Sequence, residues 1–121
     1  MPKRSKDLEE YAFSHDRCAV CYYRKYRPGR RMEIHHIQGR RGENPHDHRG
    51  LIMLCNECHY GFHSGGKRSL DICAMLTAKE EEDGEVDISY LASLRHKRAL
   101  PCDPQPLPSW AIKEREDNAN Q

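Results

Sequence analysis

Residues 31–63 read RMEIHHIQGRRGENPHDHRGLIMLCNECHYGFH, and this stretch decides the fold. Residues 33–37 have the pattern of a strand, in which His35 and His36 point to opposite faces because side chains alternate along a strand. One of the two can therefore bind a metal while the other stays free. After a polar loop, the apolar run GLIMLC at residues 50–55 predicts a second, buried strand. The two strands are expected to form a hairpin.

Helical spacing begins at Asn56, directly after the second strand. Cys55 and Cys58 lie three residues apart, and His59 and His63 lie four apart, which is one turn along the same helical face. We therefore expect one short helix with a possible metal site at each end.

A second Cys-x-x-Cys pair, Cys18 and Cys21, lies upstream of the hairpin. With the pair at the start of the helix it supplies four thiolates, the ligand set of a closed structural zinc site. Hydrophobic residues make up only 36% of the chain, so a metal cross-link would offset a marginal core. No signal-like or membrane-spanning run is seen, which favours a reducing cytoplasm, where paired cysteines bind metal. The other two cysteines, Cys73 and Cys102, are interpreted as bystanders.

This combination of motifs resembles the HNH (ββα-metal) endonuclease family, in the four-cysteine form of many phage and prophage members. The resemblance covers residues 18–63. It implies an α+β fold with a small zinc-stabilised ββα-metal core, of the His-Me finger and treble-clef-like type, and flanking helices. It also implies that His35, His59 and His63 bind the catalytic metal and that His36 is the general base.

The resemblance further implies a metal-dependent endonuclease that nicks or cuts DNA and leaves 5′-phosphate and 3′-hydroxyl ends. Mg²⁺, Mn²⁺, Ni²⁺ or Zn²⁺ would serve at the histidines, and zinc would fill the four-cysteine site. A phage- or prophage-encoded protein in the cytoplasm of a bacterial host is expected, with DNA as its partner and no membrane.

The sequence departs from the family at Gly50, where an Asn is expected just before the apolar run of the second strand. In the family this Asn is held to orient the base histidine. Asn44 or His48 could take over the role from the loop, and spacing does not select between them.

Charge is distributed unevenly along the chain. Lys and Arg outnumber Asp and Glu by fourteen to eight in residues 1–68, whereas residues 69–121 hold six against eleven. We predict a nuclease core with an N-terminal helix in the first part, and in the second a helical extension whose acidic surface could bind a protein partner. The cations expected to contact DNA are Arg30, Arg31, Arg40, Arg41, Arg49, Lys67 and Arg68.

Turn and capping signals predict helices at residues 5–15, 69–79 and 88–98, the second capped by Ser69 and the third by Asp87. A proline-rich connector precedes a last short helix at residues 109–116, anchored by Trp110, and residues 117–121 are expected to be disordered. In residues 22–31 a Pro-Gly turn should leave the arginines that follow it exposed, while the three tyrosines either face DNA or cover the core.

Two other functions compete with the nuclease. One is a non-catalytic zinc module that binds DNA or a protein, which the glycine in place of the family Asn favours. The other is a small structural zinc protein whose acidic second half docks a partner. The nuclease is favoured by the joint presence of His35, His36, His59 and His63, because neither alternative needs the complete set.

Overall fold

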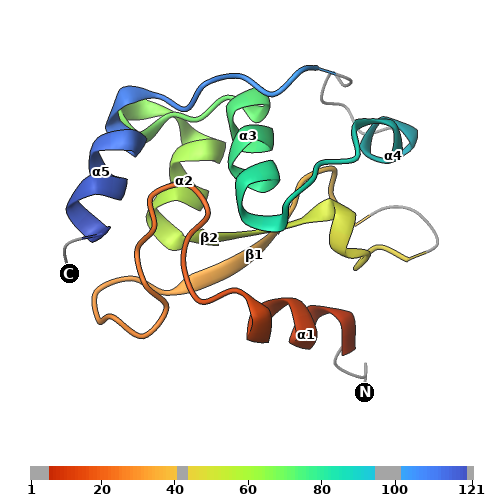
Figure 1. The fold of residues 1–121 in the computed structure, drawn as a ribbon, viewed down its shortest axis with the longest axis horizontal. Coiled ribbons are helices and arrows are strands. Elements are labelled where there is room, and N and C mark those ends of the chain that lie inside the picture. The colour runs from red at the N-terminus through yellow and green to blue at the C-terminus, as the bar shows by residue number, and fades with distance from the viewer. Residues whose placement is uncertain (1–5, 41–43, 95–101, 120–121) are drawn as a thin grey trace.

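The computed structural model describes residues 6–40, 44–94 and 102–119 (Figure 1). In chain order its elements are α1 (Lys6–Ser14), β1 (Met32–His36), η1 (His48–Gly50), β2 (Leu51–Cys55), α2 (Asn56–Ser64), η2 (Gly66–Arg68), α3 (Ile72–Asp83), α4 (Ile88–Ser93) and α5 (Ser109–Ala119). It is a small α+β fold with one two-stranded sheet. None of its described helices is long and apolar enough to cross a membrane.

The hairpin is formed as predicted, except that the first strand begins and ends one residue earlier and the second begins one residue later. β1 and β2 pair antiparallel, with His35 opposite Ile52. Every residue of β2 is buried because both faces of this strand are covered. Ile52 and Leu54 enter the main core, whereas Leu51 and Met53 pack in a second cluster with Tyr11 of α1. In Figure 1, α1 accordingly lies below the sheet, and α2 and α3 lie above it.

α2 follows β2 without a loop, which confirms the helix predicted from residue 56. The Cys55 sulfur caps it by accepting a hydrogen bond from the Cys58 amide at 3.4 Å. The helix ends at Ser64, and the next residue, Gly65, has a φ of +79° that favours glycine. Gly61 packs against η2 so closely that a β-carbon there would collide with the backbone carbonyl of Arg68.

The cap and both bounds predicted for the next helix were wrong. Asp71, rather than Ser69, caps α3, and its carboxylate accepts from the Cys73 amide at 2.7 Å. The helix continues through the acidic run to Asp83. Glu81 and Glu82 pair with arginines from elsewhere in the fold, and Asp83 pairs with Lys79 of the same helix. The cap at Asp87 is confirmed, but α4 ends at Ser93, and the rest of the predicted helix lies largely outside the described residues.

Cys73 and Cys102 form a disulfide, with their α-carbons 6.1 Å apart, so the interpretation of both as bystanders was wrong. The proline-rich connector runs along α3 and brings Cys102 beside that helix. Gln105 of the connector supports this course, since its amide donates to the Cys73 carbonyl at 3.0 Å.

The C-terminal helix is longer than predicted. α5 continues to Ala119, and Asn118 is 8% exposed, so the expected disorder was wrong for residues 117–119. Trp110 anchors its start, as expected, by donating from Nε1 to the Ser69 carbonyl at 3.1 Å. Buried hydrogen bonds of Asn118 hold its end, a signal that apolar periodicity does not report.

Candidate active site and metal centres

Three histidines meet between β1 and α2. The hairpin turns His35 inward, to 5% exposure, and α2 presents His59 and His63 one turn apart. Ligand nitrogens of the three lie within 4.8 Å of one another, and His35 Nδ1 is 3.2 Å from His59 Nε2. Nitrogens bound tetrahedrally at 2.0–2.1 Å would be about 3.4 Å apart. The histidine cluster (His35, His59 and His63) therefore has the spacing of a metal site.

Glu33 orients this cluster. His59 Nδ1 donates to Glu33 Oε1 at 2.9 Å, which leaves His59 Nε2 as the nitrogen that faces His35. Arg31 Nε holds the other carboxylate oxygen at 3.0 Å. Burial opposes ionisation of Glu33, but the hydrogen bonds from His59 and Arg31 keep its pKa below the usual range. Sequence reasoning missed Glu33, although strand alternation places it on the same face as His35.

His36 is half-buried and lines the same open hollow as the histidine cluster, a space of about 400 Å³ that Arg40 also lines. Its Nε2 lies 3.0 Å from Nδ1 of His46. Burial lowers the pKa of His36, and the positive charge of Arg40 and the proximity of His46 lower it further. The neutral imidazole, the form able to accept a proton, is therefore favoured.

The position of the missing Asn is close-packed but not crowded. A β-carbon on Gly50 would lie 3.9 Å from the ring of Tyr90. Of the side chains that the structure describes, His46 is the one that hydrogen-bonds His36. Asn44 instead accepts from the His46 amide at 3.2 Å and so holds the loop.

The four cysteines of the two Cys-x-x-Cys pairs form a second cluster. All are buried, and their sulfurs lie within 4.8 Å of one another. The sulfurs of Cys21 and Cys55 are 3.8 Å apart, which is about the edge of a tetrahedron with zinc–sulfur bonds of 2.3 Å. Burial raises the pKa of the Cys18 thiol, so a cation is needed to hold it as a thiolate. The donor set fits zinc.

Four of the predicted DNA-contacting cations remain exposed. Arg40 borders the hollow, the side chain of Arg31 is 77% exposed, and Lys67 is exposed in η2. Arg49 is exposed too, but it pairs with Asp47 and Asp87 and lies over the ring of Tyr90. Arg41 lies outside the described residues.

Two other predicted cations point into the protein. The side chain of Arg30 is 22% exposed, so the expectation of exposure after the turn was wrong for it. It contacts sulfurs of the cysteine cluster, as does Arg68. Their charges act within the fold, a placement that turn chemistry alone does not reveal.

The tyrosines of residues 22–31 divide between the two interpretations. Tyr22 lies between the guanidinium groups of Arg17 and Arg115, at 3.7 and 4.2 Å from its ring centre. Tyr23 is buried and donates to the Pro28 carbonyl. Tyr26 is 85% exposed and is the one that remains accessible to a ligand.

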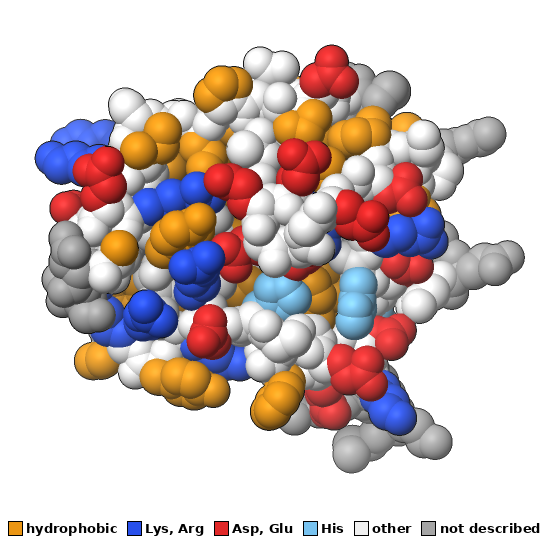
Figure 2. Space-filling view, viewed as in Figure 1, with side chains coloured by type: hydrophobic (Ala, Val, Ile, Leu, Met, Phe, Trp, Pro, Cys, Tyr) orange, Lys and Arg blue, Asp and Glu red, His pale blue; other side chains and the backbone are white. Residues whose placement is uncertain are grey.

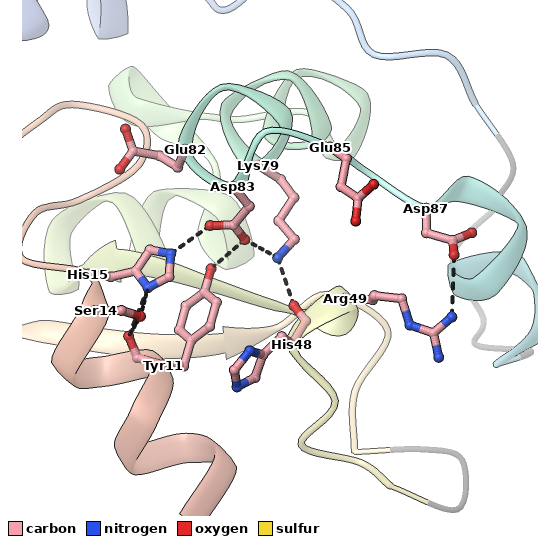
Figure 3. Close-up of a pocket in the computed structure, with 10 residues that line it drawn as sticks. All are labelled: Tyr11, Ser14, His15, His48, Arg49, Lys79, Glu82, Asp83, Glu85 and Asp87. Atoms are coloured by element: carbon pink, nitrogen blue, oxygen red, sulfur yellow. Dashed lines mark hydrogen bonds and ion pairs between the residues drawn. The ribbon is translucent and has the colours of Figure 1, made fainter.

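A polar hollow of about 380 Å³ between α1, η1 and α3 escaped sequence reasoning (Figure 3). Asp83 lies at its centre. One of its oxygens is 2.6 Å from His15 Nε2, and the other accepts from Tyr11 and from the buried Lys79. Lys79 also donates to the His48 carbonyl at 2.7 Å. These groups are paired with one another, and their contacts hold α1 against the rest of the fold.

The comparison with protein families agrees with this geometry. A family model described as HNH endonuclease matches residues 18–65. No curated protein and no solved structure matches the chain significantly. The matched segment contains the hairpin, α2, the histidine cluster and all four clustered cysteines. Residues 18–65 are therefore identified as an HNH endonuclease domain.

Proposed function

We propose that the chain is a metal-dependent endonuclease that hydrolyses DNA phosphodiester bonds to 5′-phosphate and 3′-hydroxyl ends. One observation carries the proposal: a fourth, half-buried histidine, His36, lines the same open hollow as the histidine cluster. Hydrolysis needs a base for the attacking water close to the groups that neutralise the phosphate. The hollow supplies both kinds of group within one open space.

The chain's own residues divide this work. His36 accepts the proton of the attacking water, and the positive charge of Arg40 favours its neutral form and also attracts the phosphate. Glu33 keeps His59 in the tautomer whose Nε2 faces the hollow. A divalent metal on the histidine cluster, Mg²⁺, Mn²⁺, Ni²⁺ or Zn²⁺, would offset phosphate charge and stabilise the leaving oxygen.

The cysteine cluster has a different role. Four thiolates leave no coordination position open, so zinc there would support folding rather than catalysis. The cluster joins the Cys18–Cys21 turn to the junction of β2 and α2, and the Ala19 amide donates to the Met53 carbonyl at 2.9 Å. Zinc at this junction would hold the helix that carries two of the three catalytic-metal ligands.

The DNA-facing surface is proposed from the exposed cations around the hollow. Arg40 lines the hollow. Arg31 pairs with Glu33, the residue that binds His59 beside the hollow. Lys67 extends the positive charge beyond the end of α2. Arg30 and Arg68 are left out of this surface because they contact sulfur. Binding that depends on such cations should weaken as salt rises.

Plasmid cleavage by metal-stripped protein refilled with Mg²⁺, Mn²⁺, Ni²⁺ or Zn²⁺ tests the proposal. We expect nicking or linearisation that requires metal and is lost in His36→Ala, while metal content and fold are kept. His48→Ala is the matched control and should cleave normally. It removes an imidazole that lines the hollow between α1, η1 and α3 and not the hollow of the histidine cluster. Undiminished cleavage by His36→Ala would remove His36 as the base. Folded protein that binds DNA but cleaves with no metal would favour the non-catalytic zinc module.

A further inference from the structure

We propose that Arg30, Arg68 and Glu114 form a thiolate clamp, in which the two arginines contact the sulfurs of the cysteine cluster and Glu114 of α5 holds both arginines. Through this clamp α5 slows the loss of zinc from the cluster. This inference rests on the zinc occupancy included in the proposed function. It gives the C-terminal segment, which lies outside the family match, a role in the metal centre.

Two guanidinium groups contact the sulfurs. Nη1 of Arg30 lies 3.6 Å from the Cys21 sulfur and 3.7 Å from the Cys55 sulfur. Nη2 of Arg68 lies 3.0 Å from the Cys58 sulfur. Three of the four thiolates therefore have a charged hydrogen-bond donor. Removing a group that contacts a metal ligand typically weakens metal binding by about 10- to 100-fold.

Glu114 of α5 holds both arginines. Its Oε1 accepts from Arg30 at 3.2 Å, and its Oε2 accepts from Arg68. Aromatic rings fix the other faces, since Arg30 lies over Tyr23 at 4.7 Å and Arg68 over Trp110 at 4.6 Å. Both guanidinium groups are thus held by an anion and a ring, so little freedom is lost when they contact sulfur.

The charges explain why such a clamp is useful. Zinc with four thiolates carries two excess negative charges, which are costly in a buried site. The side chains of Arg30 and Arg68 are only 22% and 21% exposed, so water screens their attraction to sulfur weakly. Two positive charges offset the excess, and Glu114 returns one negative charge while it positions them.

α5 also grips the turn that carries the first cysteine pair. Arg115 donates from Nε to the Val20 carbonyl and from Nη2 to the Ala19 carbonyl, both at 2.9 Å. Asn118 donates to the Cys21 carbonyl at 2.8 Å. In Figures 1 and 2, α5 lies on the side of the molecule where Lys and Arg side chains gather. The helix therefore fixes the backbone of the first cysteine pair as well as the charge around the sulfurs.

A thiolate that loses its charged donors carries more electron density, so iodoacetamide alkylates it faster with loss of iodide. The resulting thioether is a poor zinc ligand, and zinc is then released. The test is the rate at which purified, zinc-loaded protein releases zinc to a chromogenic chelator in the presence of iodoacetamide. We expect Glu114→Gln, Arg30→Gln and Arg68→Gln to release zinc about 10-fold faster or more than the wild type. Two variants of exposed side chains serve as controls: Asp117→Asn on α5, and Arg24→Gln in the loop after the first cysteine pair. Both should release zinc at the wild-type rate.

Cobalt-substituted protein gives a second readout. Removing a donor to sulfur should shift the thiolate-to-cobalt charge-transfer band in Arg68→Gln, whereas a purely structural role of Arg68 predicts no shift in folded protein. Arg68→Lys keeps the charge and serves if Arg68→Gln fails to fold, with release expected between wild type and Glu114→Gln.

The failures are distinguishable. Zinc release and cobalt spectra equal to wild type in all three charge-removing variants overturn the clamp and leave the zinc assignment standing. Purified wild-type protein without zinc, and unable to bind cobalt, overturns both. Plasmid cleavage tests the nuclease separately, because it depends on the histidine cluster.

Discussion

Nδ1 of His46 lies 3.0 Å from Nε2 of His36, so an imidazole from the loop before β2 holds the proposed base. Gly50 provides no side chain for this purpose. The loop itself is held in turn, because Asn44 accepts from the His46 amide and donates to Asp7 at 3.1 Å. We propose that His46 makes the orienting contact that the resemblance assigns to an Asn.

His46→Ala should slow DNA cleavage by about 10- to 100-fold, because His36 loses its orientation toward the water. Metal content should not change. His46→Gln, whose amide can still hydrogen-bond His36, should recover part of the rate. Single-turnover nicking rates of the three proteins at saturating metal make the comparison, and equal rates for His46→Ala and wild type would contradict a positioning role.

Glu33→Gln should weaken metal binding at the histidine cluster by about 10- to 100-fold, since His59 loses the carboxylate that orients it. Titration calorimetry with Mn²⁺ or Ni²⁺ on protein already loaded with zinc measures this affinity. Glu57→Gln, an exposed carboxylate at the start of α2, is the control. An unchanged dissociation constant for Glu33→Gln would show that the hydrogen bond to His59 is incidental.

Cys58→Ser should lose zinc and then unfold or aggregate, because metal-binding free energy is part of the folding free energy at such a site. Elemental analysis and thermal unfolding report the two effects. Cys73→Ser, which removes a cysteine outside the cluster, should keep one zinc per chain. Native stability in Cys58→Ser would exclude a structural zinc.

The ion pair of His15 with Asp83 should make stability depend on pH. Burial favours neutral His15, but its hydrogen bond to Asp83 raises its pKa, so its contribution is full below about pH 6.5 and is lost as pH rises through the raised pKa. Burial works against the charged form of Asp83 too, yet His15 and Lys79 lower its pKa to about 2. Its contribution is therefore full above pH 3.8 and is lost as pH falls toward 2.

Urea unfolding of His15→Gln at two pH values tests this dependence. The variant should be less stable than wild type by about 1.5–3 kcal/mol at pH 5.5, the contribution of a hydrogen bond to a charged group, and by less at pH 9. His48→Gln, whose carbonyl contact to Lys79 is retained, serves as the control. A stability difference that is the same at both pH values would refute the charged pair.

The hairpin, α2 and the two metal-ligand clusters could be predicted from the sequence because local periodicity determines them. Alternation in β1 places His35 inward, and the four-residue spacing of His59 and His63 places both on one face of α2. The roles of these residues, and the division of the chain near residue 68, remain predictions. Contacts such as that of Arg68 with Glu114 cross this division.

Features that depend on long-range contacts could not be predicted. Arg30 looks like a surface cation until α5 supplies Glu114, 84 residues later. Cys102 looks isolated until the connector folds back along α3 to Cys73. The cap of α3 was misplaced for a different reason, because Ser69 and Asp71 are both good N-capping residues. In the structure Ser69 follows the end of η2 as its C-cap, and Asp71 caps α3.

The grip of α5 on the first cysteine pair has a consequence for synthesis of the chain. Asn118 is made 97 residues after Cys21, whose carbonyl it binds. A ribosome adds about 5–20 residues per second, so the Cys21 carbonyl lacks its hydrogen bond from Asn118 for roughly 5 to 20 s. In the later part of that interval both cysteine pairs have been made and zinc can reach them before α5 covers the site.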